Sequence, residues 1–232
     1  MPMDDLFSDR AIRDQPLARA DVERLRAASP HQHLVDCDLE EADLSGLDLS
    51  GWTFERCSLR RTDLSGAKLE ETQWLSCRGA FAQFTGAQLD EARFTASDFN
   101  NCVLRRAVLT AAKFERCKLT GADLSDARTI DIRFEETLLI NARLPGISFR
   151  KQRLVKVDLS QADLREGDFR ATQFEDCSLR DANMAGSRFD DADLRGADLG
   201  GLRLFDATLF RGATISREQA GQLLGELGLK VR

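Results

Sequence analysis

An apolar residue recurs at every fifth position of this chain from Leu39 to Leu209. Of these thirty-five positions, thirty-two are Leu, Phe or Met, and only Trp74, Gly79 and Thr129 depart. A second position, two residues before each of these, is mostly Ala, Cys, Thr or Ser. A period of five fits neither the 3.6-residue repeat of a helix nor the two-residue repeat of a strand. It predicts a four-sided coil in which each pentad forms one side and both positions point inward.

One turn of such a coil takes twenty residues, so residues twenty apart should stack at the strand spacing of about 4.8 Å. The sequence shows this longer period in two sets of residues. Five of the six cysteines differ by multiples of twenty: Cys37, Cys57, Cys77, Cys117 and Cys177. Six aromatic residues do the same: Phe54, Trp74, Phe94, Phe114, Phe134 and Phe174. We therefore expect a stacked aromatic column, and free cysteines that pack as small hydrophobic residues.

Departures from the repeat yield three further expectations. The phase does not slip between residues 39 and 209, so no inserted residue is expected. Gly79 is a gap in the large-residue phase, which leucine should fill at little cost. The small-residue phase holds six larger residues: Leu47, Trp52, Ile132, Ile147, Gln152 and Leu202. The repeat is weakest over residues 129–156, where Ile130, Leu138, Ile140 and Val155 point outward and Pro145 is added. This stretch is either a patch that binds a partner or a region that only has to stack.

The triplet Ala-Asp-Leu opens the pentads that begin at Ala42, Ala122, Ala162 and Ala192. In this pattern the sequence resembles the pentapeptide-repeat family, and within it the Qnr, MfpA and AlbG group, over about three quarters of the chain. The resemblance implies an all-β fold, a right-handed quadrilateral β-helix, here over residues 34–214. Residues 1–33 would form an N-terminal capping segment with a short helix, and residues 215–232 a C-terminal helix and short strand.

Both ends of a stack of turns need caps, because each exposes an apolar cross-section and unpaired backbone. Residues 19–28 carry the pattern of a short amphipathic helix that Pro30 stops. Ser216 and Gln219 indicate a capping box that opens a second helix, and Gly228 suits its end. The apolar stripe of the second helix covers either the last turn of its own rod or a second copy of the chain.

The C-terminal segment also resembles the module through which Qnr, MfpA and AlbG proteins dimerise, and this resemblance implies a homodimer. Phe205 and Phe210 occupy outward positions of the final turn, where polar residues would be expected in a monomer. The residues expected at the dimer interface are Phe205, Phe210, Ala220, Leu223, Leu224, Leu227, Leu229 and Val231.

Charge is distributed unevenly along the chain, whose net charge of −6 argues against a general nucleic-acid-binding protein. Residues 37–76 carry a net charge of −5, residues 77–156 carry +5 and residues 157–211 carry −5. The resemblance implies a mimic of duplex DNA that binds DNA gyrase or topoisomerase IV and protects against quinolones or related toxins. In a dimer the two acidic C-terminal segments would meet, and we place the partner contact on nine aspartates there: Asp158, Asp163, Asp168, Asp176, Asp181, Asp190, Asp191, Asp193 and Asp198.

Two alternatives to this contact stay open. An aspartate before the central leucine also has a structural interpretation, because it can hydrogen-bond within the turn. The protein is alternatively an interaction scaffold for a partner other than a topoisomerase, with the basic middle or the apolar stretch as the contact.

Few residues suggest chemistry. The two histidines, His31 and His33, lie next to Asp36 without a third ligand or a nucleophile motif, so we expect no catalytic, cofactor or metal site and no enzymatic activity. No apolar run approaches the roughly 18 residues of a membrane helix, and no secretory signal opens the chain. We expect a cytoplasmic protein that binds neither a membrane nor nucleic acid directly.

Overall fold

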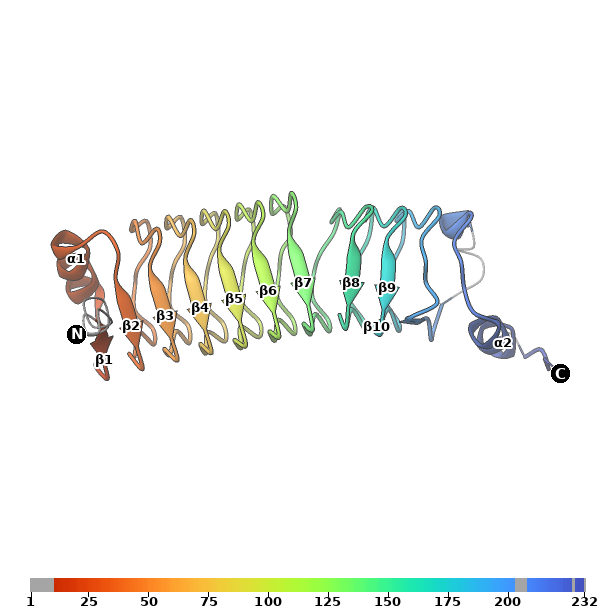
Figure 1. Ribbon diagram of the computed structural model, residues 1–232, viewed down its shortest axis with the longest axis horizontal. Coiled ribbons are helices and arrows are strands. Elements are labelled where there is room, and N and C mark those ends of the chain that lie inside the picture. Colours follow the sequence, from red (N-terminus) through yellow and green to blue (C-terminus); the bar gives the residue numbers. More distant parts are fainter. Residues whose placement is uncertain (1–10, 203–207, 227, 232) are drawn as a thin grey trace, which may run out of the picture.

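The computed structural model describes residues 11–202, 208–226 and 228–231. The chain winds into a rod of stacked coils, with helix α1 (Arg19–Ala28) at one end and helix α2 (Arg217–Glu226) at the other (Figure 1). α1 covers the residues predicted for the N-terminal helix. Among the described residues, no helix is long and apolar enough to cross a membrane.

One side of the rod is a parallel sheet of nine short strands in sequence order. Its strands are β1 (Ile12–Arg13), β2 (His33–Val35), β3 (Thr53–Glu55), β4 (Gln73–Leu75), β5 (Arg93–Thr95), β6 (Lys113–Glu115), β7 (Arg133–Glu135), β8 (Arg153–Val155) and β9 (Gln173–Glu175). Strands β10 (Cys177–Ser178) and β11 (Ala197–Asp198) pair on another side. From β2 onward, register partners lie twenty residues apart, as in Phe54 with Trp74 and Phe94 with Phe114. The predicted period of twenty and the predicted β-helix are confirmed.

Apart from the β10–β11 pair, the other three sides are held by single parallel bridges with the same spacing, such as Asp38 with Ser58, Asp43 with Asp63 and Asp48 with Lys68. Every fifth residue from Asp36 to Asp191 has a left-handed backbone conformation, for example Glu41 with φ of 58°. These residues form the corners at which the chain turns from one side to the next. The pentad is therefore one side plus one corner.

The interior contains five of the six members of the predicted aromatic column; the sixth, Phe174, is separated from them because its register partner in the preceding coil is Leu154. The rings of Phe54, Trp74, Phe94, Phe114 and Phe134 stack with centroids 4.2 to 5.5 Å apart and planes within 17° of parallel. A second stack runs through the C-terminal coils, in which Phe169 and Phe189 are 4.6 Å apart. Contacts at this distance give each ring neighbours on both faces.

The expectation that leucine would fit at Gly79 is wrong. A Cβ atom at Gly79 would lie 2.1 Å from the ring of Phe99, its stacked neighbour in the next coil. That ring packs edge-on against Trp74 at 5.9 Å and Phe94 at 5.2 Å. The missing side chain is thus replaced by a neighbouring ring, and no space remains.

The expectation of an unbroken phase is also wrong, because the last coil holds one additional residue. From Asp38 onward bridge partners are twenty residues apart, but Asp193 pairs with Thr214, twenty-one residues away. Consequently Phe210, and not Leu209, stacks on Phe189 with centroids 4.8 Å apart. Phe210 is half-buried against the core, so its predicted outward position is corrected. Phe205 lies outside the described residues.

Candidate functional site

The C-terminal module is anchored to the last coil by one polar side chain. The predicted capping box is present, since Ser216 N–H donates to Gln219 Oε1 at 2.6 Å and Gln219 N–H donates to Ser216 Oγ at 3.1 Å. Gln219 Nε2 also donates to the carbonyls of Leu194 and Ala197, at 2.7 and 2.6 Å. These bonds satisfy backbone carbonyls of the last coils and fix α2 across the end of the rod.

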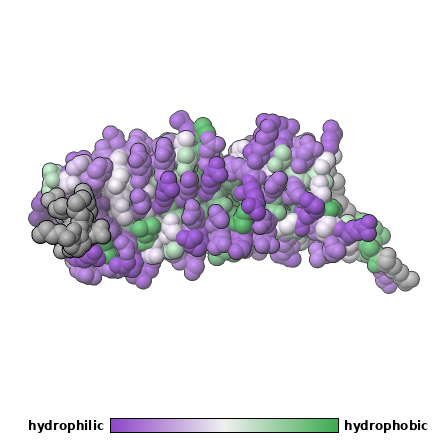
Figure 2. Space-filling view, viewed as in Figure 1, coloured by the Kyte–Doolittle hydropathy of each residue, from purple (hydrophilic) through white to green (hydrophobic). Residues whose placement is uncertain are grey.

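Only one face of this module packs on the rod. Leu223 is 7% exposed and belongs to the core, and Ala220 is half-buried. The predicted residue Leu227 lies outside the described residues. Four large apolar side chains remain exposed and form what we call the end patch: Ile215, Leu224, Leu229 and Val231, which are 36 to 57% exposed. Figure 2 shows apolar surface at this end of the molecule. The module is therefore a lid that still offers an apolar surface.

The nine predicted aspartates do not gather on one face. Their bridge partners place Asp158 on one side of the rod, Asp163 on the next and Asp168 on a third. Asp193 lies on the side of the long sheet, where it bridges to Gln173. Asp176, Asp181 and Asp191 are at corners with positive φ. The acidic C-terminal segment thus surrounds the rod.

Five of these aspartates have an arginine partner. Asp163, Asp168 and Asp193 each pair with the arginine two residues later, at 2.6 to 2.7 Å, and each also accepts a bond from that residue's backbone N–H. The hydrogen bond from the arginine side chain lowers the pKa of each of these three carboxyl groups. Asp198 pairs with Arg180 at 2.9 Å and Asp190 with Arg188 at 3.6 Å. The first three aspartates therefore form the hydrogen bonds within the turn that the structural interpretation predicts. The arginine partners of all five neutralise part of the local negative charge.

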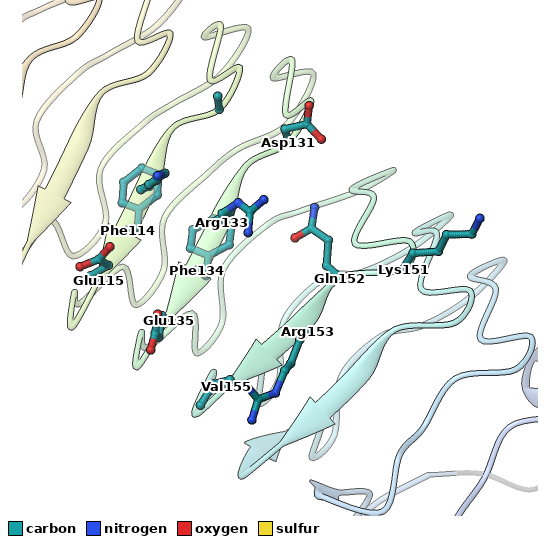
Figure 3. Close-up of a pocket in the computed structure, with 12 residues that line it drawn as sticks. Phe114, Glu115, Asp131, Arg133, Phe134, Glu135, Lys151, Gln152, Arg153 and Val155 are labelled. Carbon is teal, nitrogen blue, oxygen red and sulfur yellow. The ribbon is translucent and has the colours of Figure 1, made fainter.

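A cleft opens in the middle of the rod, between the coils that carry β7 and β8 (Figure 3). These strands pair only at Glu135 and Val155, whereas β8 and β9 pair at three residues. Five inter-coil backbone bonds that the repeat makes elsewhere are missing between these described residues. Three of them would run from the N–H groups of Asp126, Thr129 and Asp131 to the carbonyls of Pro145, Ser148 and Arg150, respectively. The other two would run in the opposite direction, from the N–H groups of Ser148 and Arg153 to the carbonyls of Ala127 and Ile132. We call this opening, between residues 126–134 and 145–154, the seam.

The seam follows from side-chain size in the small-residue phase. Ile132 and Gln152 occupy this phase twenty residues apart, so closed coils would have to stack one large side chain directly on the other. Elsewhere each large residue in this phase stacks on a small one, as Trp52 does on Thr72. Overfilling a close-packed position forces the backbone to move. The two coils therefore separate on the sides where the pair lies.

A column of cationic side chains crosses the seam. Arg93, Lys113 and Arg133 are register partners on β5, β6 and β7, and Arg153 continues this cationic column on β8. Among the described residues, the first three have no carboxylate within ion-pair distance, whereas Arg153 pairs with Glu175. A cavity of about 800 Å³ lies at the seam, beside β6, β7 and β8, and its charged lining residues are Lys113, Glu115, Asp131, Arg133, Glu135, Lys151 and Arg153 (Figure 3).

A family model described as pentapeptide repeats matches residues 37–73, 57–95, 87–126, 132–170 and 171–209. The chain belongs to the pentapeptide repeat family. Residues 127–131, which no matched segment contains, form one edge of the seam. A comparison with curated protein sequences found no match.

Two solved structures show the same fold as this pentapeptide repeat protein. Full-length QnrB1, a plasmid-mediated fluoroquinolone resistance protein, is 20% identical with a TM-score of 0.71, covering 86% of this chain and 100% of its own. HetL, involved in heterocyst differentiation regulation in the cyanobacterium Nostoc sp. strain PCC 7120, is 24% identical with a TM-score of 0.50, covering 82% of this chain and 90% of its own.

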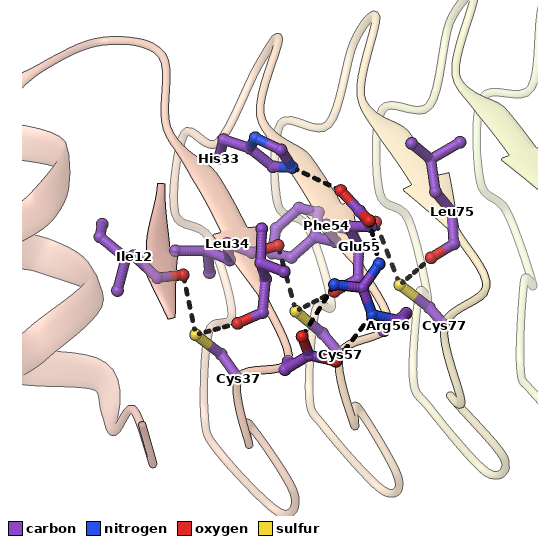
Figure 4. Close-up of polar contacts among 12 residues, drawn as sticks. Ile12, His33, Leu34, Cys37, Phe54, Glu55, Arg56, Cys57, Leu75 and Cys77 are labelled. Atoms are coloured by element: carbon purple, nitrogen blue, oxygen red, sulfur yellow. Dashed lines mark hydrogen bonds and ion pairs between the residues drawn. The ribbon is translucent and has the colours of Figure 1, made fainter. Parts of the chain in front are cut away.

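The cysteines of this pentapeptide repeat protein are buried and free. The thiols of Cys37, Cys57 and Cys77 donate to carbonyls of Ile12, Leu34 and Phe54 in the preceding coil, at 3.2 to 3.4 Å (Figure 4). Burial raises the pKa of Cys102 to about 12 and that of Cys117 to about 11, so both thiols stay protonated at neutral pH.

Of the two histidines, His33 forms a hydrogen bond with Glu55 at 3.0 Å (Figure 4). Across the described part of the chain, no three His, Cys, Asp or Glu side chains are grouped so that they could hold a metal ion.

Proposed function

We propose that this pentapeptide repeat protein is a non-enzymatic, homodimeric DNA mimic that binds a type II topoisomerase, DNA gyrase or topoisomerase IV, and protects it from quinolones or topoisomerase toxins. The observation that carries the proposal is the likeness to QnrB1, which extends over the whole of that resistance protein. A topoisomerase acts on chromosomal DNA, so the proposal places the protein in the cytoplasm.

The end patch supports the dimer. Exposed apolar side chains gathered at one end of a rod are typical of an interaction surface. A two-fold contact through this patch would cover Leu224, Leu229 and Val231 of both copies, and it would join the rods end to end. Light scattering at micromolar concentration should give twice the chain mass of 25.9 kDa. Leu224→Glu should shift the particle to a monomer, whereas Gln222→Glu, an exposed control on the same helix, should not.

The charges restrict where a topoisomerase could be contacted. Duplex DNA carries one negative charge per roughly 1.7 Å, and this rod has a basic middle. The aspartates with arginine partners also contribute little net charge. Among the described residues, Asp176, Asp181 and Asp191 form no ion pair, and these three corner residues are exposed. We therefore assign the DNA-like contact mainly to these three carboxylates.

A supercoiling assay tests the function directly. In the presence of a quinolone, micromolar protein should restore supercoiling by gyrase, and this effect should weaken as salt rises. The triple substitution of Asp176, Asp181 and Asp191 by Asn should remove the protection. The same substitution of the paired Asp163, Asp168 and Asp193 is the matched control and should leave it nearly intact.

If neither supercoiling nor its inhibition changes in the presence of the protein, the topoisomerase proposal is wrong. The second candidate, an interaction scaffold for a different protein partner, then takes its place. One observation favours it independently, namely the basic, open seam in the middle of the rod.

A further inference from the structure

We propose that the seam binds an extended acidic peptide segment of a partner protein, which adds as a strand to the exposed backbone between the two separated coils. The site comprises the two backbone edges, residues 126–134 and 145–154, and the cationic side chains beside them. It is distinct from the C-terminal surfaces of the proposed topoisomerase contact.

The backbone at the seam has N–H groups that can form hydrogen bonds with an added strand. The N–H groups of Thr129, Asp131 and Arg153 have no hydrogen-bond partner among the described residues, although their equivalents in other coils bond to the adjacent coil. A row of unpaired donors and acceptors on a strand edge is a template for another chain. Strand addition to such an edge takes its affinity from main-chain hydrogen bonds.

The cavity is large enough for a peptide and has the polar groups to orient one. Its volume of about 800 Å³ lies within the usual range of ligand pockets. Gln152 lines it, and the side-chain amide of this residue has no partner among the described residues. An amide can donate to and accept from a peptide backbone at the same time. Figure 3 shows Gln152 between Asp131 and Lys151 at the seam.

The charges select an acidic segment. Lys113, Arg133 and Lys151 line the cavity without an ion-pair partner among the described residues. Lys113 and Arg133 are directly opposed, and like charges in this arrangement repel each other. A carboxylate placed between them removes that repulsion. Glu115, Asp131 and Glu135 also line the cavity. Glu115 and Glu135 lie at the ends of β6 and β7 opposite to Lys113 and Arg133. The acidic side chains of the peptide should therefore lie beside the cationic column.

The experiment uses fluorescence anisotropy with the full chain and a fluorescein-labelled eight-residue peptide in which glutamate alternates with threonine. This peptide should bind saturably. A peptide in which lysine replaces glutamate should not bind. A third peptide, with the acidic sequence but with alternate backbone amides methylated, should bind at least about tenfold more weakly because it cannot complete a ladder.

Two matched variants locate the site. Arg133→Glu should weaken binding of the acidic peptide at least about tenfold, and Arg93→Glu should weaken it less than about twofold. Both residues belong to the cationic column and the substitutions change the net charge equally, but only Arg133 lines the cavity. Hydrogen exchange gives a second measurement. The amides of Thr129 and Arg153 should exchange quickly in the free protein and become protected with the peptide, whereas those of Leu109 and Arg133 should be protected in both states.

Each outcome decides the proposal. Equal binding of the methylated peptide overturns strand addition, and an equal loss in the two variants overturns the location. Absence of binding at about 1 mM peptide overturns the site as a whole. Topoisomerase is absent from these measurements, so they can fail or succeed independently of the supercoiling assay.

Discussion

The coils before the seam and the coils at the seam have the same five-residue period but different packing. From residue 36 to residue 125 the inter-coil ladder is continuous. Between residues 126–134 and 145–154 it opens, where the large residues Ile132 and Gln152 occupy equivalent positions of neighbouring coils. The large-residue phase is mostly occupied in both regions. The small-residue phase therefore determines whether neighbouring coils can close, because it leaves the least room for an additional atom.

Removing one ring from the aromatic column should give the largest difference in unfolding free energy between the coils before the seam and the coils at the seam. Phe114 is 1% exposed and its ring lies 4.6 Å from Phe94 and 5.2 Å from Phe134. Phe114→Ala should reduce the free energy of unfolding by about 3–5 kcal/mol, because the ladder on both sides prevents collapse of the cavity. Phe134→Ala, beside the seam, should cost less because the open coil can relax. Urea unfolding of both variants tests this, and equal losses would show that the seam gives no freedom to relax.

The next largest loss of stability is expected at Gly79, in the tightly packed coils before the seam. Gly79→Ala should destabilise the protein by about 1–3 kcal/mol, because its Cβ would meet the buried ring of Phe99. Gly46→Ala is the control: Gly46 has φ of 66° with nothing within 4 Å of the added Cβ, so only backbone strain of about 1 kcal/mol is expected. Thermal unfolding of both variants measures the difference. A more stable Gly79→Ala protein would mean that Phe99 can move aside.

The sequence predicts the fold of this protein well because the fold depends on a single period. The positions of Leu39, Phe54 and Phe94 define a coil of twenty residues, and the structure confirms their stacking. Gly79 shows the limit of such reasoning. A period identifies an empty position, but it does not show that the ring of Phe99 from the next coil already fills the space.

The candidate sites were less predictable, for two physical reasons. Leu209 and Phe210 are adjacent and both apolar, so the pattern cannot decide which one points inward after an additional residue. The seam lies in the stretch that the sequence identifies as weakest, residues 129–156. Its opening depends on two side chains in different coils, Ile132 and Gln152, and a search along a single pentad does not compare them.

Replacing the large side chain of Gln152 with a small one should close the seam, so that it resembles the coils before it. Gln152→Ala restores the small residue found at Ala92 and Ala112, so the N–H of Arg153 should reach the carbonyl of Ile132. We expect slower hydrogen exchange at Arg153 and a gain of up to about 1 kcal/mol in the free energy of unfolding. Gln173→Ala, an exposed position on β9 where the ladder is already closed, should change neither quantity. Unchanged exchange at Arg153 in Gln152→Ala would show that another residue opens the seam.

The smallest effect concerns the paired aspartates of the acidic C-terminal segment. The bond from Arg165 holds the pKa of Asp163 below its usual value, and the arginines beside Asp168 and Asp193 do the same. A carboxyl group with a lower pKa in the folded state stabilises the protein above its unfolded pKa of about 3.9. This stabilisation is lost as the pH falls through the folded pKa, so it should disappear between about pH 5 and pH 2. Each pair is partly solvated and should contribute less than about 1 kcal/mol.

Urea unfolding at pH 6 and pH 2.5 measures this contribution. The triple Asn variant of Asp163, Asp168 and Asp193 should be less stable than the unmodified protein at pH 6 and should approach it at pH 2.5, because acid protonates the carboxylates that the variant lacks. For the triple Asn variant of Asp176, Asp181 and Asp191, the loss of unfolding free energy relative to the unmodified protein should change less between pH 6 and pH 2.5. These three carboxylates form no ion pair among the described residues. An equal acid dependence in both variants would mean that the arginines do not stabilise their aspartates. The paired carboxylates would then be as available to a partner as the corner aspartates, and the assignment of the DNA-like contact to the corners would lose its basis.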